Sequence, residues 1–121
     1  MNYFLGFANM HEMSLAQSII EILLEELEKE DQVADKVFLK AGKLQQIVPE
    51  SLMFYYDIFK VEHAKLKQST LIIEIEEIEG KCPNCQKEFV MKELFFLCPD
   101  CQVAIEITKG SELYIDKIEL F

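Results

Sequence analysis

Two Cys-x-x-Cys pairs constrain this chain more than any other feature of its sequence. Cys82 and Cys85 form the first pair, Cys98 and Cys101 form the second, and twelve residues separate the pairs. A tight turn in each pair can aim two sulfurs at one point, and four thiolates about 2.3 Å from an ion complete a closed tetrahedral site. The spacing predicts a structural metal ion that folds this segment and leaves no coordination position open for a substrate.

Zinc is the metal that four cysteines in this pattern favour, and iron is the main alternative. Disulfides or a redox pair are the interpretations without a metal. A redox Cys-x-x-Cys normally occurs once, beside a βαβ unit, whereas this chain has the motif twice and shows no such unit. The segment is therefore interpreted as a zinc ribbon.

The chain is short, acidic and rich in apolar residues. Its 121 residues include 12 Lys and Arg against 22 Asp and Glu, which gives a formal charge of -10, and half of them are hydrophobic. Such a surface repels phosphate backbones and anionic membranes, so we expect neither a nucleic acid nor a membrane as partner. Residues 1–9 lack the features of a signal peptide, and no segment approaches the roughly 18 apolar residues of a transmembrane helix. These observations predict a cytoplasmic protein.

Hydrophobic periodicity predicts two helices. A capping box at Ser14 and apolar residues at helical spacing predict the first helix over residues 14–30. Pro49 suits the first turn of the second helix, which we expect to end near His63.

Alternating apolar residues predict the strands, which cover residues 37–42, 71–78, 103–107 and 113–120. The second of these has one wet face, and its pattern stops at Gly80. Gly110 predicts a turn between the last two strands. The alternation slips at Lys117, which predicts a β-bulge.

The predicted ribbon has no basic face. Its lysines are balanced by carboxylates over residues 81–110, so it lacks the positive surface that follows a phosphate backbone. Phe89, Phe95 and Phe96 are predicted to pack inside the mini-domain, with contact to a partner as the alternative. An enzyme would need an open metal position or a nucleophile with its base, and we find neither pattern. A zinc-ribbon adaptor that binds other proteins is compatible with these residues.

The chain has two histidines. His11 precedes Glu12 and the predicted N-cap Ser14, so we expect its imidazole to lie exposed outside the helix. Imidazole and deprotonated backbone amides suit the tetragonal plane of Ni(II) or Cu(II), although a lone exposed histidine is more often not a ligand. His63 is interpreted as a side chain that bonds the last carbonyls of the second helix, with an auxiliary metal role as the alternative.

Residues 10–18, with the sequence MHEMSLAQS, resemble the opening of the HypA/HybF family of hydrogenase nickel-incorporation proteins. Further stretches resemble the same family in the same order. They are the strand-to-helix junction at residues 42–44 and 48–52, the cysteine pairs with residues 95–99, and the turn at residues 110–113. Together the matching stretches span nearly the whole chain from residue 10 to residue 121.

The resemblance implies an α+β fold in which two helices lie on a three-stranded sheet and a four-cysteine zinc-ribbon mini-domain is inserted. Residues 10–80 and 111–121 then form a nickel-binding domain, residues 81–110 form a zinc-binding domain, and residues 1–9 are an N-terminal extension.

The resemblance also implies a metallochaperone, and not an enzyme, that binds Ni2+ reversibly and delivers it to the large subunit of [NiFe]-hydrogenase. Urease is a further client in this family, a HypB-type GTPase is the partner, and a homodimer is left open. The family's nickel site maps onto His11, with Glu12 beside it. Its structural Zn2+ site maps onto Cys82, Cys85, Cys98 and Cys101. The alternative function is a zinc-ribbon protein-interaction adaptor without nickel transfer.

Two features depart from the family pattern. Family members usually begin at the methionine that corresponds to Met10, whose free amine joins the nickel plane, whereas nine residues precede Met10 here. We expect Met10 to be the true start. The second departure is Gln102-Val103 after the last cysteine, where small residues are commoner, and it concerns the shape of that turn's exit.

Overall fold

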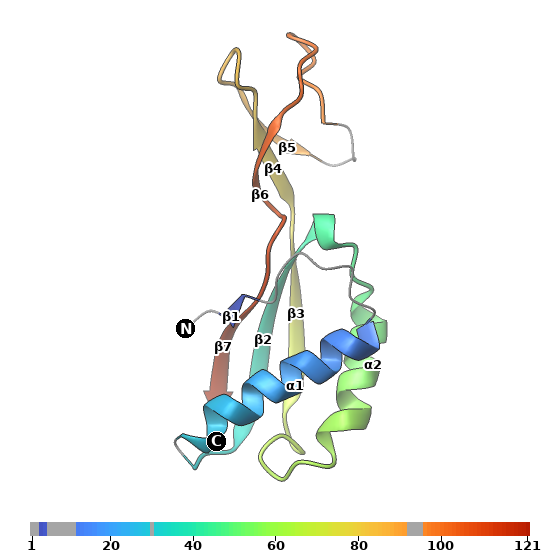
Figure 1. Ribbon diagram of the computed structural model, residues 1–121, viewed down its shortest axis with the longest axis vertical. Coiled ribbons are helices and arrows are strands. Elements are labelled where there is room, and N and C mark those ends of the chain that lie inside the picture. Colours follow the sequence, from blue (N-terminus) through green and yellow to red (C-terminus); the bar gives the residue numbers. More distant parts are fainter. Residues whose placement is uncertain (1–2, 5–11, 30, 92–95) are drawn as a thin grey trace.

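The computed structural model describes residues 3–4, 12–29, 31–91 and 96–121. Two β-sheets follow one another along the long axis of the molecule (Figure 1). The larger sheet contains, in spatial order, β1 (Tyr3–Phe4), β7 (Leu113–Leu120), β2 (Ala34–Gly42) and β3 (Thr70–Glu76), and it packs against α1 (Glu12–Glu28) and α2 (Pro49–Lys60). The smaller sheet contains β5 (Glu88–Met91), β4 (Ile78–Lys81) and β6 (Glu106–Lys109). We call residues 78–109, which hold the smaller sheet and all four cysteines, the ribbon.

The predicted α+β class, with two helices on a sheet and an inserted four-cysteine unit, is confirmed. In the larger sheet β2 runs parallel to β3 and antiparallel to β7. The short strand β1 adds a fourth member at the outer side of β7. The family resemblance implied three strands here, and alternation did not indicate β1 because two residues are too few to show a pattern.

Helix α1 buries one apolar stripe, which consists of Leu15, Ala16, Ile19, Ile20, Leu23 and Leu27. The helix begins at Glu12 and ends at Glu28, so the predicted bounds of 14–30 were wrong by two residues at each end. Ser14 lies inside the first turn and is not the N-cap. A carboxylate oxygen of Glu12 accepts a hydrogen bond from the backbone N–H of Val48 at 3.2 Å, and this distant contact holds the extra residues that the local pattern did not indicate.

Helix α2 begins at Pro49, as predicted, because the fixed φ of proline suits the first helical turn. It ends at Lys60 rather than near His63. The chain then makes consecutive turns, in which the N–H of His63 bonds the carbonyl of Lys60 at 3.0 Å and the N–H of Leu66 bonds the carbonyl of His63 at 3.0 Å. Backbone N–H groups of these turns therefore donate hydrogen bonds to the last carbonyls of the helix.

A β-bulge in β7 confirms the slip that the sequence predicted. Phe38 of β2 lies opposite Lys117, but the next residue, Leu39, lies opposite Ile115. Asp116 is thus the extra residue in the ladder. The bulge restores the inward direction of the apolar side chains on both sides of it.

One large core lies between the helices and the larger sheet. Its fully buried members from the strands include Val37, Leu39, Leu71 and Ile115, and Leu66 joins them from the turns after α2. Leu52 and Tyr56 of α2 are buried in this core, and Tyr55 and Phe59 pack partly buried against it. The buried hydroxyl of Tyr56 shares a 2.6 Å hydrogen bond with Ser69, whose own hydroxyl reaches the carbonyl of Leu66 at 2.6 Å.

The strand predicted over residues 71–78 is divided between the two sheets. β3 ends at Glu76, and β4 begins at Ile78 in the ribbon. The strand predicted over 103–107 begins later, as β6 from Glu106, while Ala104 forms an isolated bridge with Leu97. Periodicity missed both shifts because the apolar pattern continues while the pairing partner changes.

Two glycines make the joint between the sheets possible. Gly110 has φ +92°, which confirms the predicted turn, and a Cβ there would lie 2.6 Å from the carbonyl oxygen of Glu77. A Cβ on Gly42 would overlap the carbonyl of Gly110. Hydrogen bonds from the N–H of Gly42 to Glu112 at 2.7 Å and from the N–H of Leu44 to Gly110 at 3.1 Å fasten the crossing.

Candidate metal centre

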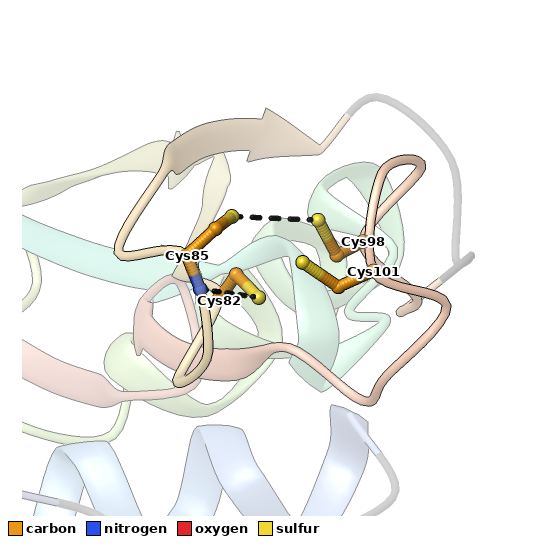
Figure 2. A group of neighbouring side chains, drawn as sticks. All are labelled: Cys82, Cys85, Cys98 and Cys101. Carbon is orange, nitrogen blue, oxygen red and sulfur yellow. Dashed lines mark hydrogen bonds between the residues drawn. The ribbon is translucent and has the colours of Figure 1, made fainter.

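The two cysteine pairs fold into two turns with the same backbone hydrogen bonds. The N–H of Gln86 bonds the carbonyl of Cys82 at 2.9 Å, and the N–H of Gln102 bonds the carbonyl of Cys98 at 2.9 Å. In the return direction the N–H of Cys82 reaches Lys87 and that of Cys98 reaches Val103, each at 2.9 Å. Each turn therefore presents its two sulfurs on one side, toward the other turn (Figure 2).

Both turns leave through a glutamine in the left-handed region. Gln86 has φ 65° and Gln102 has φ 58°, a conformation that favours glycine. Their side-chain amides bond back to the carbonyls of Pro83 at 3.0 Å and Pro99 at 3.1 Å. The second turn thus leaves with the same shape as the first, although Gln102 departs from the small residue expected there.

The geometry of the four sulfurs suits one ion. The Sγ atoms of Cys82, Cys85, Cys98 and Cys101 all lie within 4.8 Å of one another, and Cys85 Sγ is 3.8 Å from Cys98 Sγ (Figure 2). Four ligands about 2.3 Å from a tetrahedral centre are separated by about 3.8 Å. Thiolates select soft or borderline ions, so the four-cysteine cluster can hold a metal such as zinc.

The pKa values of Cys82 and Cys85 are shifted in opposite directions. The backbone N–H of Cys85, which lies 3.5 Å from Cys82 Sγ, lowers the pKa of Cys82 to about 7. The N–H of Lys87 lowers the pKa of Cys85, but desolvation and the adjacent sulfurs outweigh it and raise that pKa to about 11. A metal ion must displace the remaining protons, so its affinity falls as the pH falls.

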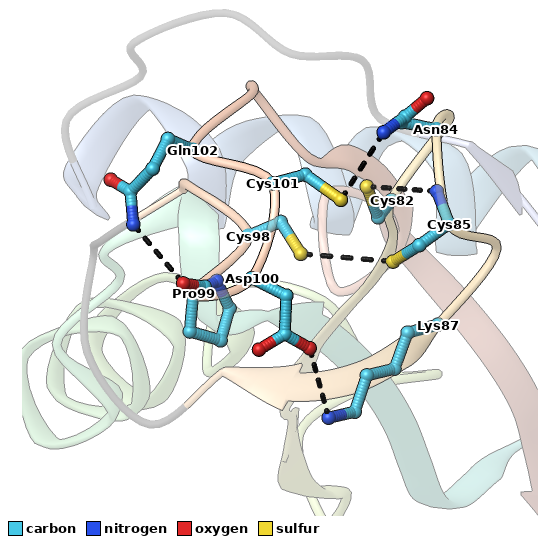
Figure 3. Close-up of polar contacts among 9 residues, drawn as sticks. All are labelled: Cys82, Asn84, Cys85, Lys87, Cys98, Pro99, Asp100, Cys101 and Gln102. Carbon is cyan, nitrogen blue, oxygen red and sulfur yellow. Dashed lines mark hydrogen bonds and ion pairs between the residues drawn. The ribbon is translucent and has the colours of Figure 1, made fainter.

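Side chains outside the cysteines connect the two turns. The amide of Asn84 in the first turn donates to Cys101 Sγ at 3.3 Å, and Lys87 pairs with Asp100 of the second turn at 3.5 Å (Figure 3). A donor to a ligand sulfur restrains its direction and partly offsets its charge. Sequence reasoning missed this pair of contacts, since nothing in either turn alone indicates the partner.

A small apolar cluster lies beneath the turns. Its buried members are Ile78, Cys82, Met91, Cys98 and Ile105. Phe89 and Phe96 pack partly buried against them, which confirms the predicted core packing for these two rings. Leu44, from the turn after β2, also contacts this cluster and links it to the larger sheet. Phe95 lies outside the described residues.

The structure describes one of the two residues predicted as a nickel site. His11 lies outside the described residues. Glu12 opens α1, and one of its carboxylate oxygens is the acceptor for Val48. His63 lies half-buried in the turns after α2, and the four cysteines are the only group of three or more potential metal ligands in the part of the chain that the structure describes.

None of the described helices is long and apolar enough to cross a lipid bilayer. Helix α1, the longest of them, has 17 residues and carries carboxylates along its exposed face.

Comparison with known proteins gives one consistent match. The family described as "Hydrogenase/urease nickel incorporation, metallochaperone, hypA" matches residues 10–120. The hydrogenase maturation factor HypA of Caldanaerobacter subterraneus subsp. tengcongensis is 34% identical over 114 residues, which span 92% of this chain and 99% of the relative. That of Rhizobium leguminosarum bv. viciae is 37% identical over 115 residues, with the same two coverages of 92% and 99%.

Solved structures show the same fold. The solution structure of the Ni metallochaperone HypA from Helicobacter pylori superposes with a TM-score of 0.68 at 24% identity and covers 93% of this chain and 98% of that one. A second solution structure, of HypA protein, has a TM-score of 0.70 at 24% identity and covers 93% and 97% of the two chains. The fold of this chain is therefore shared with both solved structures over 93% of its length.

Proposed function

Because this chain belongs to the HypA family of hydrogenase/urease nickel-incorporation metallochaperones, we propose that it binds Ni2+ reversibly and delivers it during maturation of [NiFe]-hydrogenase, with urease as a further client. The observation that carries this proposal is the family match over residues 10–120, which includes both the Met-His-Glu segment and the four cysteines. A HypB-type GTPase and the hydrogenase large subunit are the proposed partners. The protein carries a metal and performs no catalytic step of its own.

The proposed nickel site is His11 with Glu12. An imidazole and deprotonated amides can surround Ni2+ in a plane, and the negative charge of those amides and of Glu12 offsets the positive end of α1. Glu12 uses one carboxylate oxygen for Val48, and a carboxylate has a second oxygen for another partner. A site that has a small number of ligands, on a chain segment next to a helix, suits an ion that must be released again.

The proposed role of the four cysteines is to hold a structural Zn2+. Closed tetrahedral coordination by Cys82, Cys85, Cys98 and Cys101 leaves no position for a substrate. The ion would fix the two turns relative to each other. On this proposal residues 81–110 form the zinc-binding domain, residues 10–80 with 111–121 form the nickel-binding domain, and residues 1–9 are an extension.

Nickel titration with simultaneous measurement of zinc tests the proposal. We expect about one Ni2+ per chain, no displacement of zinc, and loss of nickel binding in His11→Ala. His63→Ala is the matched control and should leave both metals in place. Retention of full nickel affinity by His11→Ala would refute the assigned site, and a zinc-loaded wild-type protein that takes up no nickel would favour a zinc-ribbon adaptor.

The role of the Met10 amine can be tested separately. In a chain that begins at Met10 the free amine can join the nickel plane, whereas with residues 1–9 attached that nitrogen must lose an amide proton before it binds. We expect the shorter chain to bind nickel more tightly near neutral pH and with a shallower pH dependence, while both chains hold zinc equally. Equal nickel affinities at every pH would exclude the amine as a ligand.

A further inference from the structure

The outer face of α2 carries a stripe of exposed apolar side chains. Phe54 is 60% exposed, Ile58 is 47% exposed and Val61, directly after the helix, is 55% exposed. The three follow one another at i, i+4 and i+7, so they form a single ridge on the helix surface. We call these three residues the α2 ridge. Met53, 38% exposed, lies one position before the ridge.

The ridge lies outside the apolar core of the described chain. Leu52 and Tyr56, on the opposite side of α2, are fully buried and make its contact with the core. In Figure 1 α2 forms an outer edge of the molecule, and no other labelled element lies beyond it. The ridge also has an aromatic anchor of fixed direction, because the ring of Phe54 packs edge-on against Tyr55 with centroids 5.5 Å apart.

The charges beside the ridge are mainly negative. Glu50 and Glu62 are exposed, and Asp57 directly precedes Ile58 in α2. The lysine of α2, Lys60, is folded back: its ammonium group bonds the carbonyl of Ser69 at 2.7 Å and pairs with Asp57 at 3.0 Å. Residues 49–62 thus present three carboxylates and one internally bonded lysine.

We propose that the α2 ridge is a docking surface for an amphipathic helix of another protein, whose apolar face is flanked by lysine or arginine. A straight i, i+4, i+7 ridge fits the groove between ridges of a second helix, and phenylalanine and methionine are side chains that interface cores favour. Basic flanks complement Glu50 and Glu62 and leave no buried charge unpaired. A second copy of this chain would place carboxylates opposite carboxylates, and each copy has a net charge of -10.

The helix that carries the ridge begins beside the residue that opens α1. The backbone N–H of Val48, directly before α2, is the donor to the carboxylate of Glu12. A partner helix on the ridge would therefore lie on the same helix, α2, whose first turn follows the donor to Glu12. Binding of such a helix to the ridge needs no nickel.

The test uses the zinc-loaded full chain and two synthetic 18-residue helical peptides. Both peptides carry leucine along one face, and the flanks of that face are lysine in one peptide and glutamate in the other. We expect the lysine peptide to shift amide resonances along the outer face of α2, and to bind at least about tenfold more tightly at low salt than the glutamate peptide. Equal binding of the two peptides, or resonance shifts elsewhere, would overturn the proposal.

Variants of the ridge sharpen the test. Phe54→Gln together with Ile58→Gln should weaken binding of the lysine peptide by at least about tenfold, and glutamine preserves helix propensity. Val90→Gln, at a 59% exposed position of the ribbon, is the matched control and should bind as the wild type does. A wild-type dimer in sedimentation that the ridge variant dissociates would identify a second copy as the occupant and would refute the proposed partner class.

Discussion

The two sheets of this protein are stabilised in different ways. Among the described residues, the larger sheet and its helices share a cluster of sixteen buried apolar residues. The ribbon has a cluster of five, and two of those are cysteines of the candidate metal centre. A core of the first kind stabilises a fold through apolar burial alone. A unit of the second kind is below the size at which burial suffices, so on the proposed function we expect a metal to stabilise it.

The joint between the sheets is a third kind of structure, made of backbone and not of side chains. Gly42 and Gly110 let two chain segments cross at close range, and backbone hydrogen bonds hold them there. Leu44, from outside the ribbon, packs against the ribbon's cluster. Four substitutions separate these three contributions, in decreasing order of expected effect.

Cys98→Ser should have the largest effect, and it should be confined to the ribbon. Loss of one of four ligands should remove the metal, whose binding supplies about 10–16 kcal/mol of folding free energy in small zinc domains. Amide hydrogen exchange should show lost protection in β4–β6 and retained protection in α1 and β2. Thr108→Ser, an exposed change in β6, is the control. Ribbon amides that stay protected in metal-free Cys98→Ser would contradict the comparison.

Leu39→Ala should damage the other region. Leu39 is fully buried in β2, and removing its side chain leaves a cavity that costs about 2–5 kcal/mol. Urea unfolding followed by the helical signal gives this loss, while the metal content of the folded protein should not change. Ile72→Ala, at an exposed position of the neighbouring strand, should cost much less. Loss of metal in parallel with the helical signal would show that the two regions unfold as one unit.

Gly42→Ala should loosen the joint. The new Cβ overlaps the carbonyl of Gly110, so one backbone segment must move, with an expected loss of about 1–3 kcal/mol. The amide of Leu44, which bonds Gly110, should exchange faster. Gly80→Ala is the comparison variant, because its Cβ meets first a side-chain methyl, Cγ2 of Ile105 at 2.5 Å, and the nearest backbone atom, the carbonyl oxygen of Glu106, is 3.0 Å away. Equal effects of the two substitutions would show that the crossing carries no special constraint.

Tyr114→Phe should have the smallest effect at neutral pH and a distinct effect at high pH. The Tyr114 hydroxyl donates to Glu76 at 3.1 Å, a bond worth about 1 kcal/mol or less here. Desolvation, then Glu76, raises the pKa of Tyr114 to about 12, whereas an unfolded tyrosine has a pKa of about 10. The stability from this group is therefore present below pH 10 and is lost as the pH rises through 12.

Urea unfolding at pH 8, 10 and 11 measures that difference. The wild type should lose stability more steeply than Tyr114→Phe above pH 10, so the two curves should converge. Tyr55→Phe, which removes a tyrosine hydroxyl from α2, is the control for the loss of a hydroxyl at pH 8. Parallel curves for Tyr114→Phe would mean that the hydroxyl makes no pH-dependent contribution.

Local signals predicted those parts of the fold that depend on near neighbours. The apolar stripe of α1, the start of α2 at Pro49, the turn at Gly110 and the bulge beside Lys117 were all readable, because each follows from spacing or from the backbone of one residue. The clustering of the four cysteines was readable for the same reason.

Contacts between distant segments were not readable. The start of α1 at Glu12 depends on Val48, 36 residues away, and overrides the capping signal of Ser14. The change of sheet after Glu76 depends on which strands β3 and β4 pair with, since the apolar pattern continues across it. The resemblance of residues 10–18 to a family suggested the nickel site, but residue 11 lies outside the described chain.

By itself the sequence determined that this protein has two helices, an acidic surface and two cysteine turns able to meet at one ion, because helix periodicity and a four-residue turn are properties of short segments. Only the tertiary structure decided which turn contacts support the sulfurs, such as Asn84 with Cys101, and that the α2 ridge stays exposed while Leu52 and Tyr56 are buried. The reason is physical: burial and partner choice depend on what the rest of the chain places beside a residue, and a local pattern does not contain that information.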